Sequence, residues 1–206
     1  MTRENQKTQK MIIKNIEQAR NSINNSFKQI QFECKSVLGS ELHYQAIIYH
    51  CLRNFGNVPI SQIGMNVKIA IKNPKTHFFK EGILKKNENF REGKEIIPDI
   101  SIFSEHIKSD FRRRNFKNTL KETLYSLEIK ASERENGRLQ PKEIKTDIIK
   151  LKSQYTETKL KHNKEIGIGI MVIDTAPNEN ERMRKNTLDE VKRFAKENGV
   201  DFWYCS

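Results

Sequence analysis

The longest strongly apolar run in this chain of 206 residues is IGIGIMVI, at positions 166–173. A helix that spans a bilayer needs about 20 such residues, so this run is far too short to cross a membrane. A short, continuous apolar run is instead typical of a strand that is buried in a sheet. The run therefore predicts a buried strand at residues 166–174.

The other helices and strands follow from the spacing of apolar residues. Helices are predicted at residues 4–35, 40–55, 141–155 and about 179–198. Strands are predicted at residues 65–73, 95–103, 124–132, 166–174 and 200–205, with a charged hairpin or loop over 74–95. The order α, α, β, β, β, α, β, α, β predicts an α/β sandwich around a mixed sheet. The apolar stripe of the first helix is narrow and suits either the core or a dimer seam.

The charge balance is strongly basic. Lysine and arginine total 38 against 26 aspartate and glutamate residues, which leaves a net charge of +12. This balance favours a polyanionic partner, because each phosphate contact made by lysine or arginine releases condensed counterions. The alternative is a lysine-rich surface that keeps the protein in solution and binds nothing.

The cysteines and the first residues bear on the compartment. Cys34, Cys51 and Cys205 are widely spaced and show no zinc-binding spacing, so they are expected to be free thiols in a reducing compartment. The first residues are polar and lack the apolar segment of a signal peptide. We therefore expect a soluble, cytoplasmic protein without a membrane partner.

One of several Glu-x-Lys tripeptides lies inside a well-defined predicted strand. Strand alternation places Glu128 and Lys130 side by side on one face of residues 124–132. In the preceding strand Asp99 and Ser101 share a face, and Pro98 suits a strand start or a bulge. These charges form either a catalytic cluster or a cross-strand ion pair on a solvated face.

The segments IIPDISIF (96–103) and SLEIKAS (126–132) together resemble the motif of the PD-(D/E)XK nuclease superfamily, which has the restriction-endonuclease-like fold. The predicted order of helix, three strands, helix and strand also matches the αβββαβ core of that family. The resemblance covers roughly residues 40–175 of a single nuclease domain spanning 1–206. Residues 1–38 would then be an added helix, serving as a dimer or DNA-contact arm, and 176–206 an added helix and strand.

The resemblance implies a set of catalytic residues. Asp99 and Glu128 would hold one Mg²⁺, or Mn²⁺ in its place, with the carbonyl oxygen of Ile129 and the carboxylate of Glu41 as further ligands. Oxygen ligands of this kind suit a hard cation, which lowers the pKa of water and neutralises charge on a phosphate. Lys130 would orient the attacking water and stabilise negative charge, with a general-base role as an alternative.

Glu41 also has a simpler interpretation. It lies in the first turn of the second helix, where the helix dipole favours an acidic residue whatever its function. His43, Lys142 and Lys145 are weaker candidates for contacts near the site, and so is Gln45.

The segment between the second and third predicted strands, residues 105–121, is basic and carries interleaved Phe111 and Phe116. It would suit the DNA backbone, and the alternative is an ordinary exposed loop or short helix. The candidate DNA-binding residues are Lys108, Arg112, Arg113, Arg114, Lys117 and Lys121.

The function expected from the sequence is a metal-dependent DNA endonuclease, of the type II restriction kind and acting as a homodimer. A repair, recombination or phage-defence nuclease that recognises DNA structure is the alternative enzyme, and RNA remains an alternative substrate. A third hypothesis is a nucleic-acid-binding module that keeps the fold without activity.

Overall fold

The computed structural model describes residues 12–84, 93–132 and 137–206, and it contains a five-stranded sheet in the order β1-β4-β5-β6-β7. The strands are β1 (Ile63–Met65), β4 (Ile100–Phe103), β5 (Thr123–Ala131), β6 (Gly167–Ile173) and β7 (Asp201–Cys205). Strand β4 pairs antiparallel with β1 on one side and with β5 on the other, whereas β6 pairs parallel with both β5 and β7. The predicted mixed sheet is confirmed.

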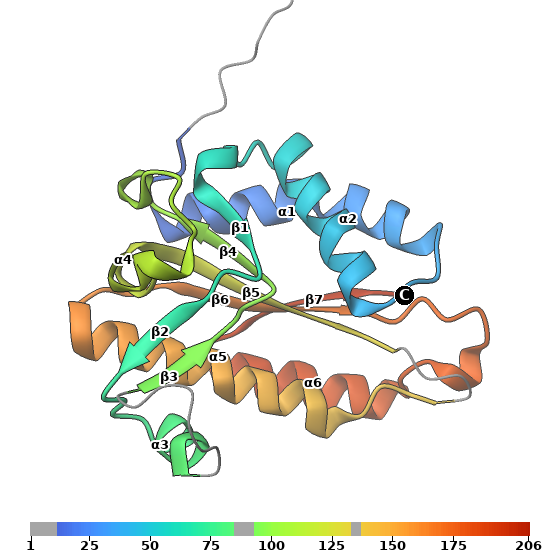
Figure 1. The fold of residues 1–206 in the computed structure, drawn as a ribbon. Helices are drawn as coiled ribbons and strands as arrows, with labels where there is room; N and C mark the ends of the chain where they lie inside the picture. Colours follow the sequence, from blue (N-terminus) through green and yellow to red (C-terminus); the bar gives the residue numbers. More distant parts are fainter. Residues whose placement is uncertain (1–11, 85–92, 133–136) are drawn as a thin grey trace, which may run out of the picture.

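Helices cover both faces of this sheet (Figure 1). One layer holds α1 (Ile16–Lys35) and α2 (Glu41–Asn54), and the other holds α5 (Pro141–His162) and α6 (Lys185–Glu197). On the α1 side, Ile23 and Ile30 are fully buried in one core with the β5 residues Leu127 and Ile129. The stripe of the first helix therefore covers the core, and the α/β sandwich is confirmed.

Strand β6 contains the apolar run and is buried along its whole length. Its even-numbered residues pack under α5 and α6, and its odd-numbered residues face α1 and α2. Glycine is required at position 167 because the ring of Tyr125 crosses the strand there. A Cβ atom added to Gly167 would lie 2.1 Å from Cδ2 of Tyr125.

The two strands predicted at residues 65–73 and 95–103 are each broken in the middle. The first becomes β1 and β2 (Ile69–Lys72), and the second becomes β3 (Gly93–Ile96) and β4, with β2 and β3 pairing as a separate two-stranded sheet. The two breaks face each other, because each adjoins the last pair of the β1–β4 ladder, Met65 with Ile100. Pro98 has no N–H to donate, and Asn66 adopts a left-handed backbone conformation with φ of 55°.

Residues 77–84 form a helix, α3 (His77–Leu84), where the sequence predicted a hairpin or loop. The buried carboxylate of Glu157 on α5 accepts hydrogen bonds from the N–H groups of Lys75 and Thr76, both at 2.6 Å, just before α3. Part of the predicted loop, residues 85–92, lies outside the described residues.

The other boundaries shift by a few residues. The first helix begins at Ile16, after Asn15 caps it by accepting a hydrogen bond from the N–H of Gln18, and residues 4–11 lie outside the described part. The helix predicted at about 179–198 starts only at Lys185, after a turn of 3₁₀-helix at Glu179–Glu181. Residues 105–121 fold into η2 (Glu105–Ile107), η3 (Arg113–Asn115) and most of α4 (Phe116–Glu122).

Within the described ranges, no helix has the length and apolar character needed to cross a membrane. Cys34, Cys51 and Cys205 are buried free thiols, as the spacing predicted. Burial raises the pKa of Cys34 and of Cys51 to about 12, so both thiols stay protonated at neutral pH.

Candidate active site

A polar cluster forms where the β3–β4 chain bends away from β5. The ladder between β4 and β5 ends at Ile100, which pairs with Leu127. Asp99 lies at the bend, where its backbone carbonyl accepts a hydrogen bond from the N–H of Asn66 at 3.0 Å. Its carboxylate Oδ2 accepts the N–H of Ile129 at 2.6 Å, the bond that a further residue of β4 would otherwise satisfy.

Asp99, just before β4, and Glu128, on β5, lie opposite each other. Continued by one residue, the register that pairs Ile100 with Leu127 places Asp99 opposite Glu128, and opposite residues of an antiparallel pair share a face. Both side chains are buried, with 7% of Asp99 and 3% of Glu128 exposed. The carbonyl of Ile129 points to the same side as its N–H, toward Asp99, because both groups of one strand residue face the same neighbour.

Lysines from two elements balance these carboxylates. The Nζ atom of Lys150, on α5, donates to Oε2 of Glu128 at 2.8 Å. Lys130 is salt-bridged to Glu41 Oε2 at 3.2 Å and to Asp147 Oδ2 at 3.1 Å. Asp147 also lies 3.5 Å from Nζ of Lys150, so it links the two lysines.

A second hydrogen-bonded chain holds Asp99 from the side of α2. The side-chain amide of Gln45 donates to Oδ1 of Asp99, and its oxygen accepts from Nδ2 of Asn66 at 3.0 Å. Both oxygens of Asp99 are therefore engaged. In contrast, Oε1 of Glu128 is buried and has no hydrogen-bond partner among the described residues.

Burial makes both carboxylates weaker acids than usual. It raises the pKa of Glu128 to about 8, where Lys150 lowers the value and the charges of Asp99 and Asp147 raise it further. The pKa of Asp99 is raised to about 6, mainly by burial, although the hydrogen bond from Ile129 opposes the change. Such shifts are typical of functional sites, although structural ion-pair networks also produce them.

Lys130 remains a cation in this environment. Burial alone would lower its pKa, but the charges of Asp147 and Glu41 outweigh burial and raise the pKa above its ordinary value. A general base has to give up its proton near the working pH. The observed contacts therefore favour Lys130 as a hydrogen-bond donor and disfavour the general-base role considered from the sequence.

Some of these residues fit a divalent cation. In the described ranges, no group of three or more His, Cys, Asp or Glu residues is arranged to hold a metal ion. Mg²⁺ does not require such a cage, because it keeps several waters and is commonly held by one or two carboxylates. Asp99 and Glu128 supply two, and the unpartnered Oε1 of Glu128 is an oxygen that a cation would satisfy.

The site adjoins a small polar cavity. The cavity measures about 270 Å³ and is lined by Glu41, Lys130, Ser132, Arg138 and Glu143, among others. Glu41 is thus beside both Lys130 and open space. Its carboxylate contributes to raising the pKa of Asp99, which indicates electrostatic coupling to the buried carboxylates.

The structure brings together the four residues Asp99, Glu128, Lys130 and Glu41, and it adds Gln45, the weaker candidate, as a direct partner of Asp99. Sequence reasoning missed three contributors, which are Asn66, Asp147 and Lys150. Asp147 and Lys150 lie three residues apart, beside the apolar stripe of α5. Because the apolar stripe of α5 packs on the sheet, charged residues at the edge of that stripe could have been expected to contact Glu128 and Lys130.

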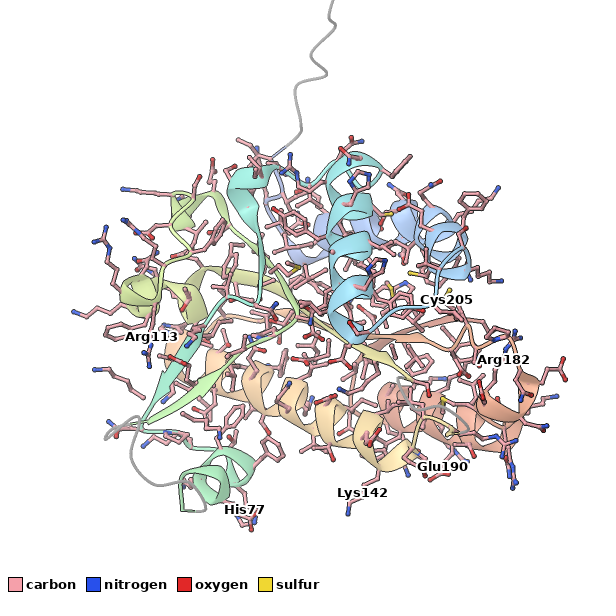
Figure 2. All side chains as sticks on the ribbon, turned by 45° about the vertical axis from the view of Figure 1, so that its right-hand side comes forward. His77, Arg113, Lys142, Arg182, Glu190 and Cys205 are labelled. Carbon is pink, nitrogen blue, oxygen red and sulfur yellow. The ribbon has the colours of Figure 1, made fainter. Side chains whose placement is uncertain are left out.

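Other weak candidates lie away from this cluster. His43 is exposed, and Lys145 is salt-bridged to Glu190 on α6. Lys142 projects from α5 away from the sheet (Figure 2).

The predicted DNA-binding segment does not lie beside Asp99. It precedes β5, and Thr123 is five residues before Glu128, so roughly 17 Å of strand separates the two regions. Two arginines are held in ion pairs, Arg112 with Asp110 at 2.7 Å and Arg113 with Glu95 at 3.0 Å. All six candidate side chains are exposed: Lys108, Arg112, Arg113, Arg114, Lys117 and Lys121.

The two phenylalanines of that segment are half-buried and contact the rest of the protein. Phe111 packs against Phe103 with ring centroids 5.3 Å apart, and Nζ of Lys72 lies 5.1 Å from the ring centroid of Phe116. They hold the segment on the protein, so its basic side chains are carried on an anchored surface. Figure 2 shows Arg113 on this surface, far from Cys205 at the other end of the sheet.

Comparison of the chain with protein-family models, with curated proteins and with solved structures finds no match. The resemblance to the PD-(D/E)XK motif therefore stays a prediction from the residues, and the geometry of the site has to support the function.

Proposed function

We propose that this protein is a metal-dependent endonuclease that hydrolyses phosphodiester bonds of DNA at the site of Asp99, Glu128 and Lys130. The observation that carries the proposal is the pair of buried carboxylates, one at the bend just before β4 and one on the neighbouring strand β5, with a lysine two residues after the second. An ordinary ion pair on a solvated face does not fit, because Glu128 is 3% exposed and one of its oxygens lacks a partner among the described residues. Burying an incompletely paired carboxylate costs stability, and a catalytic site gives a reason for that cost.

The chain's own residues divide the work. Asp99 and Glu128 would hold the cation, with the carbonyl of Ile129 facing the same side. A bound Mg²⁺ would supply positive charge to the scissile phosphate and would make water more acidic. Glu41 borders the adjoining cavity beside Lys130 and would orient water there.

Lys130 and Lys150 have different surroundings and therefore different roles. Glu41 and Asp147 hold the Lys130 ammonium in its charged form at the cavity, where it would donate to the phosphate or to the attacking water. Lys150 contacts Glu128 directly and keeps its pKa below the value that burial alone would give. Lys150 would therefore favour the ionised carboxylate that binds a cation.

The order of elements supports a restriction-endonuclease-like core. Helix α2 comes first, β1, β4 and β5 follow as an antiparallel set, and α5 then crosses over to β6, which is parallel to β5. We propose that the enzyme acts as a homodimer, since two copies supply one site for each strand of a duplex. The net charge of +12 supports a nucleic-acid partner.

The test is cleavage of supercoiled plasmid with Mg²⁺ or Mn²⁺, repeated with EDTA. We expect metal-dependent nicking and linearisation that Asp99→Asn, Glu128→Gln and Lys130→Met each abolish. Glu190→Gln, which changes an exposed carboxylate on α6 that is paired with Lys145, should leave the rate unchanged. Discrete fragments would indicate a restriction enzyme, and a smear would indicate recognition of DNA structure. Salt-sensitive DNA binding without cleavage would refute the enzyme and favour a binding module.

A further inference from the structure

A basic cavity lies at the opposite end of β5 from Asp99. It measures about 570 Å³ and lies between η2, α4 and the connection from α5 to β6. Its lining includes the charged or titratable residues Lys108, Lys121, His162, Lys164, Asp110 and Glu122. Because α4 leads directly into β5, the cavity and the carboxylate cluster are at the two ends of the same strand.

Both carboxylates of the cavity are already engaged. Asp110 receives two hydrogen bonds of 2.7 Å from the guanidinium group of Arg112. Glu122 is buried, and its Oε2 accepts the hydroxyl of Ser104 at 2.5 Å. Its other oxygen is 3.8 Å from Nζ of Lys121, which is a long ion pair. With Asp110 paired to Arg112, the lining sets Lys108, Lys121 and Lys164 against the single charge of Glu122, so positive charge is in excess.

The positive groups are held close together by the fold. Nζ of Lys164 donates to the backbone carbonyl of Lys121 at 2.8 Å, which fixes the α5–β6 connection against the last turn of α4. The pKa of Lys164 is lowered by burial, with Glu122 opposing and Lys121 adding to the effect. The pKa of His162 is likewise lowered by burial and then by Lys121, Lys161 and Lys164. An anion placed among these groups would relieve their mutual repulsion.

We propose that this cavity binds a backbone phosphate of nucleic acid, with Lys108, Lys121 and Lys164 as the phosphate-binding residues. Lysine ammonium groups bind phosphate as point charges, and they need no fixed bidentate geometry. The choice of nucleic acid as the source of the phosphate rests on the proposed function, whereas the anion site itself does not. The site would hold the duplex by its backbone at one end of β5. The carboxylate cluster, roughly 17 Å away along β5, would act on the same duplex.

The experiment measures binding of a fluorescent 30-base-pair duplex by anisotropy in EDTA, over a series of salt concentrations. The variant is Lys121→Ala with Lys164→Ala, and the matched control is Lys185→Ala with Lys196→Ala, which removes two exposed lysines from α6. Each lost phosphate contact should reduce the slope of log K against log salt by about 0.9. We expect the slope for the cavity variant to be smaller by about 0.9, which corresponds to one phosphate contact. Its affinity at 0.1 M salt should be roughly 5-fold to 10-fold lower. The control should lose less than about 2-fold.

A second variant shows whether a loss of binding comes from a loss of stability. Lys164 also supports the end of α4, so Lys108→Ala, which changes an exposed side chain, should reproduce part of the loss while the melting temperature stays unchanged. Equal losses in the cavity variant and the α6 control would overturn the proposal and leave the lysines only a role at helix C-termini.

A measurement with inorganic phosphate distinguishes a site for free phosphate from a site for the phosphate of nucleic acid. If millimolar phosphate raises the melting temperature of the unchanged protein but not of the cavity variant, while DNA binding is the same in both, the nucleic-acid assignment is overturned. Because every binding measurement is made in EDTA, it is independent of hydrolysis. A protein that never cleaves DNA yet shows the expected slope change would contradict the proposed function and retain this inference.

Discussion

Glu128→Gln should stabilise this protein while it destroys the proposed activity. The side chain is almost fully buried, and its pKa is raised to about 8 from the ordinary 4.5. That difference corresponds to at most roughly 5 kcal/mol of destabilisation when the carboxyl group is ionised. Glutamine has nearly the same shape and carries no charge, so it removes this cost.

The attraction of Lys150 is already contained in this difference, because Lys150 lowers the pKa of Glu128 to the value of about 8. Glutamine resembles the protonated carboxyl group, so the gain at pH 9 should approach this upper limit of roughly 5 kcal/mol. In a chain of this length such a gain corresponds to a rise of up to about 10–20 °C in melting temperature.

The pH dependence follows from the sign of the pKa change. A carboxyl group whose pKa is raised by folding stabilises the native state below its unfolded pKa, and the stabilisation is lost as pH rises toward about 8. At pH 5 Glu128 is protonated in the folded state, so glutamate and glutamine should be nearly equivalent. The advantage of glutamine should then grow between pH 5 and pH 9.

The assay is thermal unfolding by circular dichroism at pH 5, 7 and 9 in EDTA. Glu190→Gln is the matched control, because Glu190 is exposed and its pKa is lowered by hydrogen bonding and charge attraction to Lys145. That control should be neutral or slightly destabilising at every pH. A Glu128→Gln protein that is no more stable at pH 9, or whose advantage does not grow with pH, would refute the burial argument.

Three further substitutions test Lys150, Glu157 and Gly167. Lys150→Met should move the midpoint of the cleavage pH profile to higher pH, because Lys150 lowers the pKa of Glu128, and an unchanged midpoint would contradict this coupling. Glu157→Ala leaves the amide and hydroxyl donors of Thr76 without their acceptor, so urea denaturation should show a loss of about 2–4 kcal/mol. Gly167→Ala forces a methyl group into the ring of Tyr125, and we expect a loss of about 1–3 kcal/mol by the same measurement, with no loss if the ring can shift freely.

Local patterns predicted the central part of the fold. The continuous apolar run at residues 166–173 forms β6, and alternation along residues 124–132 correctly placed Glu128 and Lys130 on one face. Both inferences depend only on side-chain periodicity, which is a property of a single segment. Helices α2 and α5 were predictable for the same reason, since each has a clear apolar stripe.

The bend at Asp99 could not be predicted in the same way. Pro98 indicated an interruption, but the second break, at Asn66 in the partner strand, depends on pairing between segments far apart in the sequence. That bend leaves the N–H of Ile129 to be satisfied by a carboxylate. The contributions of Asp147 and Lys150 likewise depend on how α5 lies across β5, which no single segment determines.

Binding of Mn²⁺, measured by electron paramagnetic resonance, shows whether Asp99 and Glu128 together hold one divalent cation. Free Mn²⁺ gives a strong signal that is lost on binding, so a titration counts the sites without any need for DNA or turnover. We expect about one Mn²⁺ per chain in the unchanged protein and in Glu190→Gln. The site should be lost in both Asp99→Asn and Glu128→Gln. Undiminished binding of one Mn²⁺ in those two variants would contradict a cation site shared by Asp99 and Glu128.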